Sequence, residues 1–75
     1  MNIGINFLEH NDVEFIVLHW AYPVLPRKGD IFHSDLLGDK IPYPQIGEAT
    51  VCKVKYITWE LENNEPMPIL HLIVT

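Results

Sequence analysis

The chain has 75 residues, 48% of them hydrophobic, and its ten acidic against five basic residues give a net charge of −5. This length allows a single domain over residues 1–75 with a thin core, and the apolar content excludes a disordered chain. The single cysteine excludes an internal disulfide, and the longest apolar run, residues 15–18, is too short to cross a membrane. Since no basic segment precedes an apolar run at the start, we expect a cytoplasmic protein without a secretory signal.

The first half of the chain predicts three strands separated by turns. Residues 1–8 alternate between apolar and polar side chains, which is the period of a strand. Residues 13–22 are apolar on both faces in the middle, so we expect either a central strand or one covered by a neighbouring subunit. A turn follows in which Gly29 can take positive φ and Asp30 can accept a backbone N–H, and it leads into a short strand over 31–34.

The segment between this strand and the last third of the chain is predicted to be irregular. Ser34 can cap one helical turn that ends at Gly38, or the same residues can form a loop tip. Residues 40–47 contain two prolines, which exclude a central strand, so we expect an extended connection over the surface. One of three apolar side chains in this connection is expected to reach the core: Ile41, Tyr43 or Ile46.

The last third of the chain predicts one long β-hairpin. Residues 49–61 and 67–75 are rich in β-branched and aromatic residues, and residues 62–66 are typical of a turn. Beyond Tyr56 the alternation of apolar side chains changes phase by one residue, which indicates a β-bulge or a strong bend. The predicted core combines side chains from all the strands: Ile5, Phe7, Phe15, Val17, Ile31, Val51, Val54, Tyr56, Ile57, Leu70 and Leu72.

Two segments resemble a known fold group. Residues 25–32 read Leu-Pro-Arg-Lys-Gly-Asp-Ile-Phe, and residues 51–56 read Val-Cys-Lys-Val-Lys-Tyr and lead into the closing hairpin. In this order they resemble the small SH3-like barrels, many of which are short bacterial or phage proteins of uncharacterised function. In those proteins a Pro-x-x-Gly-Asp turn opens a strand, and a Val-x-x-Val-x-aromatic strand crosses the barrel. The resemblance covers roughly residues 13–75 and implies an all-β, SH3-like barrel of five or six short antiparallel strands, with no common catalytic residue.

No residue pattern points to catalysis or to metal binding. The four histidines are far apart, and the chain has no Cys-x-x-Cys, no His-x-His and no Gly-rich phosphate loop. Cys52 lies in the middle of a predicted strand, where a small core residue is the expected role rather than a nucleophile. An enzyme would need His33 and Asp35 to lie together in a cleft, and Cys52 or His71 would also have to reach it. We therefore expect no enzymatic activity, no cofactor and no metal.

Apolar surface supplies the first functional hypothesis. Trp20, Tyr22 and Trp59, together with the apolar terminal strand over residues 70–74, exceed what a thin core can bury, and we expect this terminal strand to be a sheet edge that can pair with a partner. Small cores also need reinforcement, which self-association can provide. We therefore expect a protein-protein interaction or self-assembly module that binds a protein partner or a second copy of the chain.

A basic strand supplies the alternative hypothesis. Lys53 and Lys55 share a strand face, and a bend can bring Trp59, Trp20 or Tyr22 near them. The candidate binding residues are the two lysines with Tyr56 or Trp59. Basic strands with nearby aromatic rings hold single-stranded nucleic acid by neutralising phosphates and stacking bases. The alternative is thus a nucleic-acid-binding accessory protein, which the net charge of −5 disfavours.

Overall fold

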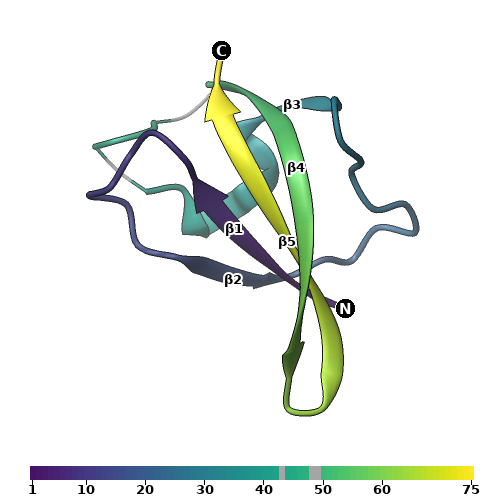
Figure 1. The fold of residues 1–75 in the computed structure, drawn as a ribbon. Coiled ribbons are helices and arrows are strands. Elements are labelled where there is room, and N and C mark those ends of the chain that lie inside the picture. The colour runs from purple at the N-terminus through teal and green to yellow at the C-terminus, as the bar shows by residue number, and fades with distance from the viewer. Residues whose placement is uncertain (43, 48–49) are drawn as a thin grey trace.

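The computed structural model describes residues 1–42, 44–47 and 50–75 and shows a mostly β protein (Figure 1). The elements are β1 (Asn2–Phe7), β2 (Ile16–His19), β3 (Ile31–His33), the 3-10 helix η1 (Ser34–Lys40), β4 (Val51–Glu62) and β5 (Glu65–Val74). The five strands form one mixed sheet in the order β2-β1-β5-β4-β3, which is curled into a half-barrel.

The expected closed, fully antiparallel barrel is wrong in two respects. β1 and β5 are parallel, with Gly4 opposite Ile69 and Phe7 opposite Leu72, while the other pairs are antiparallel. The sheet also leaves β2 and β3 as unpaired edges, so it curls without closing (Figure 1). Parallel neighbours need a long connection, and here most of the chain lies between the two strands.

The C-terminal hairpin of β4 and β5 is confirmed. Its turn is Asn63–Asn64, where both residues have positive φ (51° and 64°), as a type I′ turn requires. The ladder between the strands shifts by one residue between Val54 and Tyr56, so Lys55 is the extra residue of a β-bulge. This confirms the expected change of phase, but the bulge lies just before Tyr56 rather than after it.

The core lies on one face of the curled sheet, which we term the inner face because it carries the buried side chains of Ile5 and Leu70. The predicted core residues that are buried there are Ile5, Phe7, Val54, Leu70 and Leu72. Four predicted core residues are exposed instead: Phe15, Val17, Ile31 and Tyr56. These predictions are wrong because the four side chains lie on the outer face, which is covered only in part, around Met67 and Ile69. The bulge also displaces Tyr56 from the face that Val54 occupies, since Tyr56 pairs with His71.

The segment 13–22 is not a central strand, because only its middle pairs with β1 and forms the edge strand β2. Ile16 and Leu18 pack against the core, whereas Val17 is exposed on the outer face. The alternative, that a neighbouring subunit covers this strand, stays a prediction. Phe15 lies across the outer face at Gly4, where any side chain larger than hydrogen would collide with its ring.

The turn before β3 is fastened to β4 by its backbone. Gly29 has the expected positive φ of 92°, and the Arg27 N–H donates to Asp30 Oδ2 at 2.8 Å. The Gly29 N–H donates to the Val54 carbonyl at 2.8 Å, and the Val54 N–H donates to the Asp30 carbonyl at 2.9 Å. Residue 28 is therefore held beside the middle of β4.

Ser34 begins the helix η1, which confirms the helical alternative, but it does not cap it. The helix makes no side-chain capping hydrogen bond at its start. Instead Ser34 is fully buried, where its Oγ donates to the Gly47 carbonyl at 2.8 Å and accepts from the Thr50 N–H at 3.1 Å. The serine thus ties the start of η1 to the connection that leads into β4.

The connection after η1 reaches the core as expected, but it is not fully extended. Ile46 is buried and Ile41 is half-buried. The Ile46 N–H donates to the Pro42 carbonyl at 2.9 Å, which closes a turn. Tyr43, the third candidate, lies outside the described residues, as does the predicted start of β4 at residue 49.

Candidate functional site

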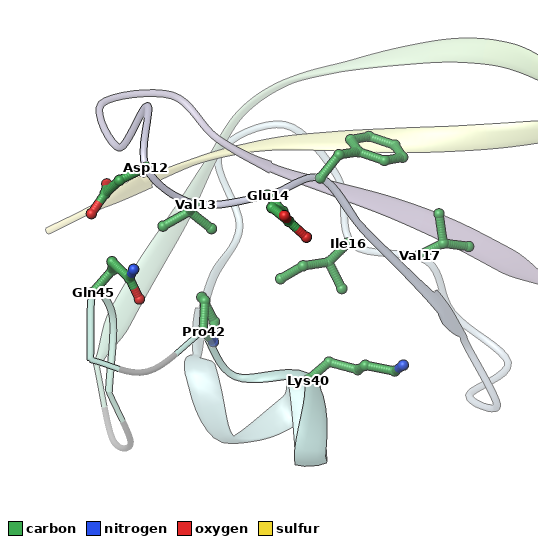
Figure 2. Close-up of a pocket in the computed structure, with 9 residues that line it drawn as sticks. Asp12, Val13, Glu14, Ile16, Val17, Lys40, Pro42 and Gln45 are labelled. Carbon is green, nitrogen blue, oxygen red and sulfur yellow. The ribbon is translucent and has the colours of Figure 1, made fainter.

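The half-barrel is open along a seam between the free edge of β2 and the helix η1. Two adjoining pockets of about 470 Å³ and 460 Å³ lie along it, and they share Val17 and Lys40. We term this the β2 seam, which is lined by residues 12–22, residues 36–40, Pro42 and Gln45. In Figure 2, Val13 and Ile16 lie on one side of the first pocket, and Pro42 and Lys40 lie on the other.

Two of the predicted binding residues close one end of the β2 seam. Trp20 is only 8% exposed, and its Nε1–H donates to the Val24 carbonyl at 2.9 Å. The ring of Tyr22 meets Trp20 edge-on with the centroids 5.0 Å apart, and Tyr22 is 57% exposed. Trp20 therefore belongs to the core, and Tyr22 is the ring of this pair that a partner can contact.

The rim of the β2 seam is mostly acidic. Among the residues that line the two pockets, Asp12, Glu14 and Asp39 carry carboxylates, and Lys40 is the basic residue. A ligand that enters this seam meets an excess of negative charge. A segment with basic side chains therefore complements it better than an acidic one.

A second concavity, of about 600 Å³, lies over β4 and β5 next to the turn before β3. We term it the lysine groove, because it is lined by Lys28, Lys53 and Lys55, together with Gly29, Val54, Tyr56 and Ile73. Three of the five basic residues of the chain thus lie around one groove. None of these lining residues is acidic, so the groove is a local basic surface on a protein of net charge −5.

Tyr56 is held in place by a stacked histidine. The rings of Tyr56 and His71 lie 4.3 Å apart with 23° between their planes. His71 is bound through both ring nitrogens, Nδ1 to Asn6 Nδ2 at 3.0 Å and Nε2 to Thr58 Oγ1 at 2.8 Å. Desolvation lowers the pKa of His71, and the charge of Glu60 partly opposes that shift. The neutral ring fits these contacts, because its Nδ1 accepts from the Asn6 amide while its Nε2–H donates to Thr58.

The lowered pKa of His71 predicts a pH dependence of stability. Because its pKa is lowered on folding from 6.5, the unfolded chain binds more protons between the two values. The stability that neutral His71 contributes is complete above pH 6.5 and is lost as the pH falls through the folded-state pKa. In thermal unfolding, the melting temperature should fall more for the wild type than for His71→Gln between about pH 7.5 and about pH 5. Equal falls would contradict the assignment.

Cys52 lies in the core, as predicted. It is fully buried, and this burial raises the pKa of its thiol. A protonated, enclosed thiol is a poor nucleophile. In the described part of the chain, no three His, Cys, Asp or Glu side chains are grouped to hold a metal ion.

The structure divides the predicted binding residues between the two surfaces. Trp20 and Tyr22 line the β2 seam, and Lys53, Lys55 and Tyr56 line the lysine groove. Trp59 lines neither; it is 58% exposed and pairs with Pro68 in the hairpin of β4 and β5. The tip of this hairpin extends beyond the other strands (Figure 1). Sequence analysis missed Lys28 at the groove and Lys40 at the seam. No local signal marks either residue, because Lys28 is brought to the groove by the backbone bonds of its turn to Val54, and Lys40 is brought to the seam by the position of η1 opposite β2.

Comparison of the chain with protein-family models, curated proteins and solved structures finds no match. None of the helices among the described residues is long and apolar enough to span a membrane. The function therefore has to be argued from the β2 seam and the lysine groove themselves.

Proposed function

We propose that the protein is an interaction module that binds an extended segment of a partner protein as an additional strand beside β2. The observation that carries this proposal is the unpaired edge of β2 along an open seam. Peptides that add a strand to a sheet edge gain affinity from main-chain hydrogen bonds and specificity from their alternate side chains. The sequence also favours an interaction module, but the edge expected at residues 70–74 is wrong, because β5 is paired on both sides.

The main chain of β2 supports this mode of binding. The Trp20 N–H donates to the Met1 carbonyl at 2.7 Å, and the Met1 amino group donates to the Trp20 carbonyl at 3.3 Å. Hydrogen-bonded pairs alternate along an antiparallel ladder, so Leu18 also turns its N–H and C=O toward β1. By the same alternation, Val17 and His19 turn theirs toward the β2 seam. Among the described residues, no turn or loop forms a backbone hydrogen bond with these groups, so they can bond an added strand.

The side chains along the seam indicate what such a segment would contain. Its inward side chains would meet the apolar side chains of Ile16, Leu18 and Leu37, which belong to or pack against the core. Its remaining side chains would lie near the acidic rim. The segment that fits best therefore alternates apolar and basic residues. A relationship with the SH3-like barrels, carried by the turn at 26–30 and by β4, is part of the same proposal.

The proposal is tested by fluorescence anisotropy with a labelled peptide of alternating lysine and valine. A matched peptide with glutamate in place of lysine should bind more weakly, and so should one whose backbone is N-methylated at alternate positions. On the protein, Val17→Pro removes an outward N–H without removing a bond to β1, so the fold should persist. We expect it to weaken binding about tenfold, whereas Val17→Thr should bind like the wild type.

Two outcomes of this experiment would overturn the proposal. The first is equal affinity of the wild type and Val17→Pro, provided that circular dichroism shows both to be folded. The second is a dimer in sedimentation equilibrium that Val17→Pro dissociates, because a second copy of the chain would then occupy the edge in place of a partner.

A further inference from the structure

We propose that the lysine groove is a second binding site, which holds single-stranded nucleic acid with phosphates on Lys28, Lys53 and Lys55 and a base stacked on Tyr56. The groove is formed by other residues than those of the β2 seam. The inference therefore does not depend on the proposed peptide site.

The backbone holds the three lysines around one groove. The turn that carries Lys28 bonds through Gly29 and Asp30 to both the C=O and the N–H of Val54. Lys53 and Lys55 flank Val54 in β4, and Lys55 is the extra residue of the bulge. Three lysine side chains thereby line one groove, and their like charges repel one another. A bound chain of phosphates would relieve that repulsion and release counterions.

Tyr56 provides a rigid surface for stacking beside the lysines. It is 42% exposed and lines the groove, while its ring is stacked against His71. His71 is itself held by Asn6 and Thr58, so the stacked pair is already ordered. Stacking of a base on Tyr56 therefore costs little side-chain conformational entropy. Stacking of bases on aromatic side chains tolerates any sequence, because every base has a π-face.

The combination favours nucleic acid over an acidic peptide. An acidic peptide would gain from the lysines alone, whereas a nucleotide uses the lysines and the aromatic ring together. Five of the ten acidic residues lie away from the groove, whereas Asp30 lies in the turn that carries Lys28 and Glu60 acts electrostatically on His71. Glu62 and Glu65 lie at the tip of the hairpin, and three further carboxylates line the β2 seam. Salt screens such distant charges more strongly than those at the groove.

The test is fluorescence anisotropy with a labelled oligothymidylate and with an abasic oligomer of the same length. Each phosphate contact with a single strand contributes about −0.7 to the slope of log affinity against log salt concentration. Three contacts therefore predict that the affinity falls roughly 20-fold from about 50 to about 200 mM salt. Lys28→Gln, Lys53→Gln and Lys55→Gln should each lower both the affinity and that slope. Lys40→Gln is the matched control, because Lys40 lies in the β2 seam, and it should bind like the wild type.

The role of the ring is tested separately. Tyr56→Leu should weaken binding of the oligothymidylate about tenfold and leave the abasic oligomer nearly unaffected, which loss of folding would not do. The inference is overturned if Lys40→Gln is as damaging as the groove variants, or if no saturable binding occurs at low salt. It is also overturned if oligoglutamate binds as tightly and Tyr56→Leu has no effect, because the groove would then take acidic peptides.

Discussion

Replacement of Leu70 by alanine is expected to lower the free energy of unfolding by about 3 kcal/mol, the largest effect of any single change proposed for this protein. Leu70 is fully buried in β5, opposite Ile5 of β1 and Ile57 of β4. Its side chain thus joins the strand from the N-terminal end of the chain to the C-terminal hairpin. Truncation would remove these contacts and leave a cavity that the surrounding strands can close only in part.

The effect is large relative to the total stability of so small a domain. A chain of this length is expected to be stable by about 4–11 kcal/mol, so Leu70→Ala should lower the melting temperature by roughly 12–24 °C. Urea unfolding followed by circular dichroism measures the loss. Ile31→Ala is the control, because Ile31 is 63% exposed and should lose less than about 1 kcal/mol. Equal losses in the two variants would mean that the core is not where the structure places it.

The second large effect is expected from Ser34→Ala, which should destabilise the fold by about 2–3 kcal/mol. The hydroxyl of Ser34 is fully buried and serves the Gly47 carbonyl and the Thr50 N–H at once. Alanine would leave both part-buried backbone groups without this partner. Removal of one partner lowers the stability by more than the net contribution of the hydrogen bond, because the group that remains is desolvated without a hydrogen bond to compensate.

Chemical denaturation of Ser34→Ala against Thr75→Val distinguishes this role from loss of a surface hydroxyl. Thr75 Oγ1 donates to the Val51 carbonyl at 3.4 Å in an exposed position, so its removal should change stability by less than about 0.5 kcal/mol. If Ser34→Ala were as mild as Thr75→Val, the connection between η1 and β4 would not depend on the serine.

The elements that could be predicted from the sequence are those that depend on local pattern. The hairpin of β4 and β5 is encoded by two runs of β-branched and aromatic residues around a polar turn, and the bulge at Lys55 leaves a visible change of phase. The turn at Gly29 and Asp30 follows from backbone preferences of these two residues. Each of these features depends on one continuous segment of the chain.

The features that could not be predicted depend on which distant strands become neighbours. Alternation shows that residues 1–8 form a strand, but it carries no information that β1 lies parallel to β5. The apolar pattern of residues 13–22 likewise cannot show that β2 is an edge. The two sites could not be predicted for the same reason, because each combines segments that are distant in the sequence. The lysine groove needs Lys28 brought to β4 by the Val54 hydrogen bonds, and the β2 seam needs η1 placed opposite β2.

The most direct test of the central claim, that β2 accepts an added strand, is amide hydrogen exchange by NMR with and without the peptide of alternating lysine and valine. The account predicts that the amides of Val17 and His19 exchange quickly in the free protein and become protected when the peptide is saturating. The amide of Leu18 should be protected in both states, because it already faces β1. Saturable binding without new protection at Val17 and His19 would contradict strand addition and would place the peptide elsewhere on the molecule.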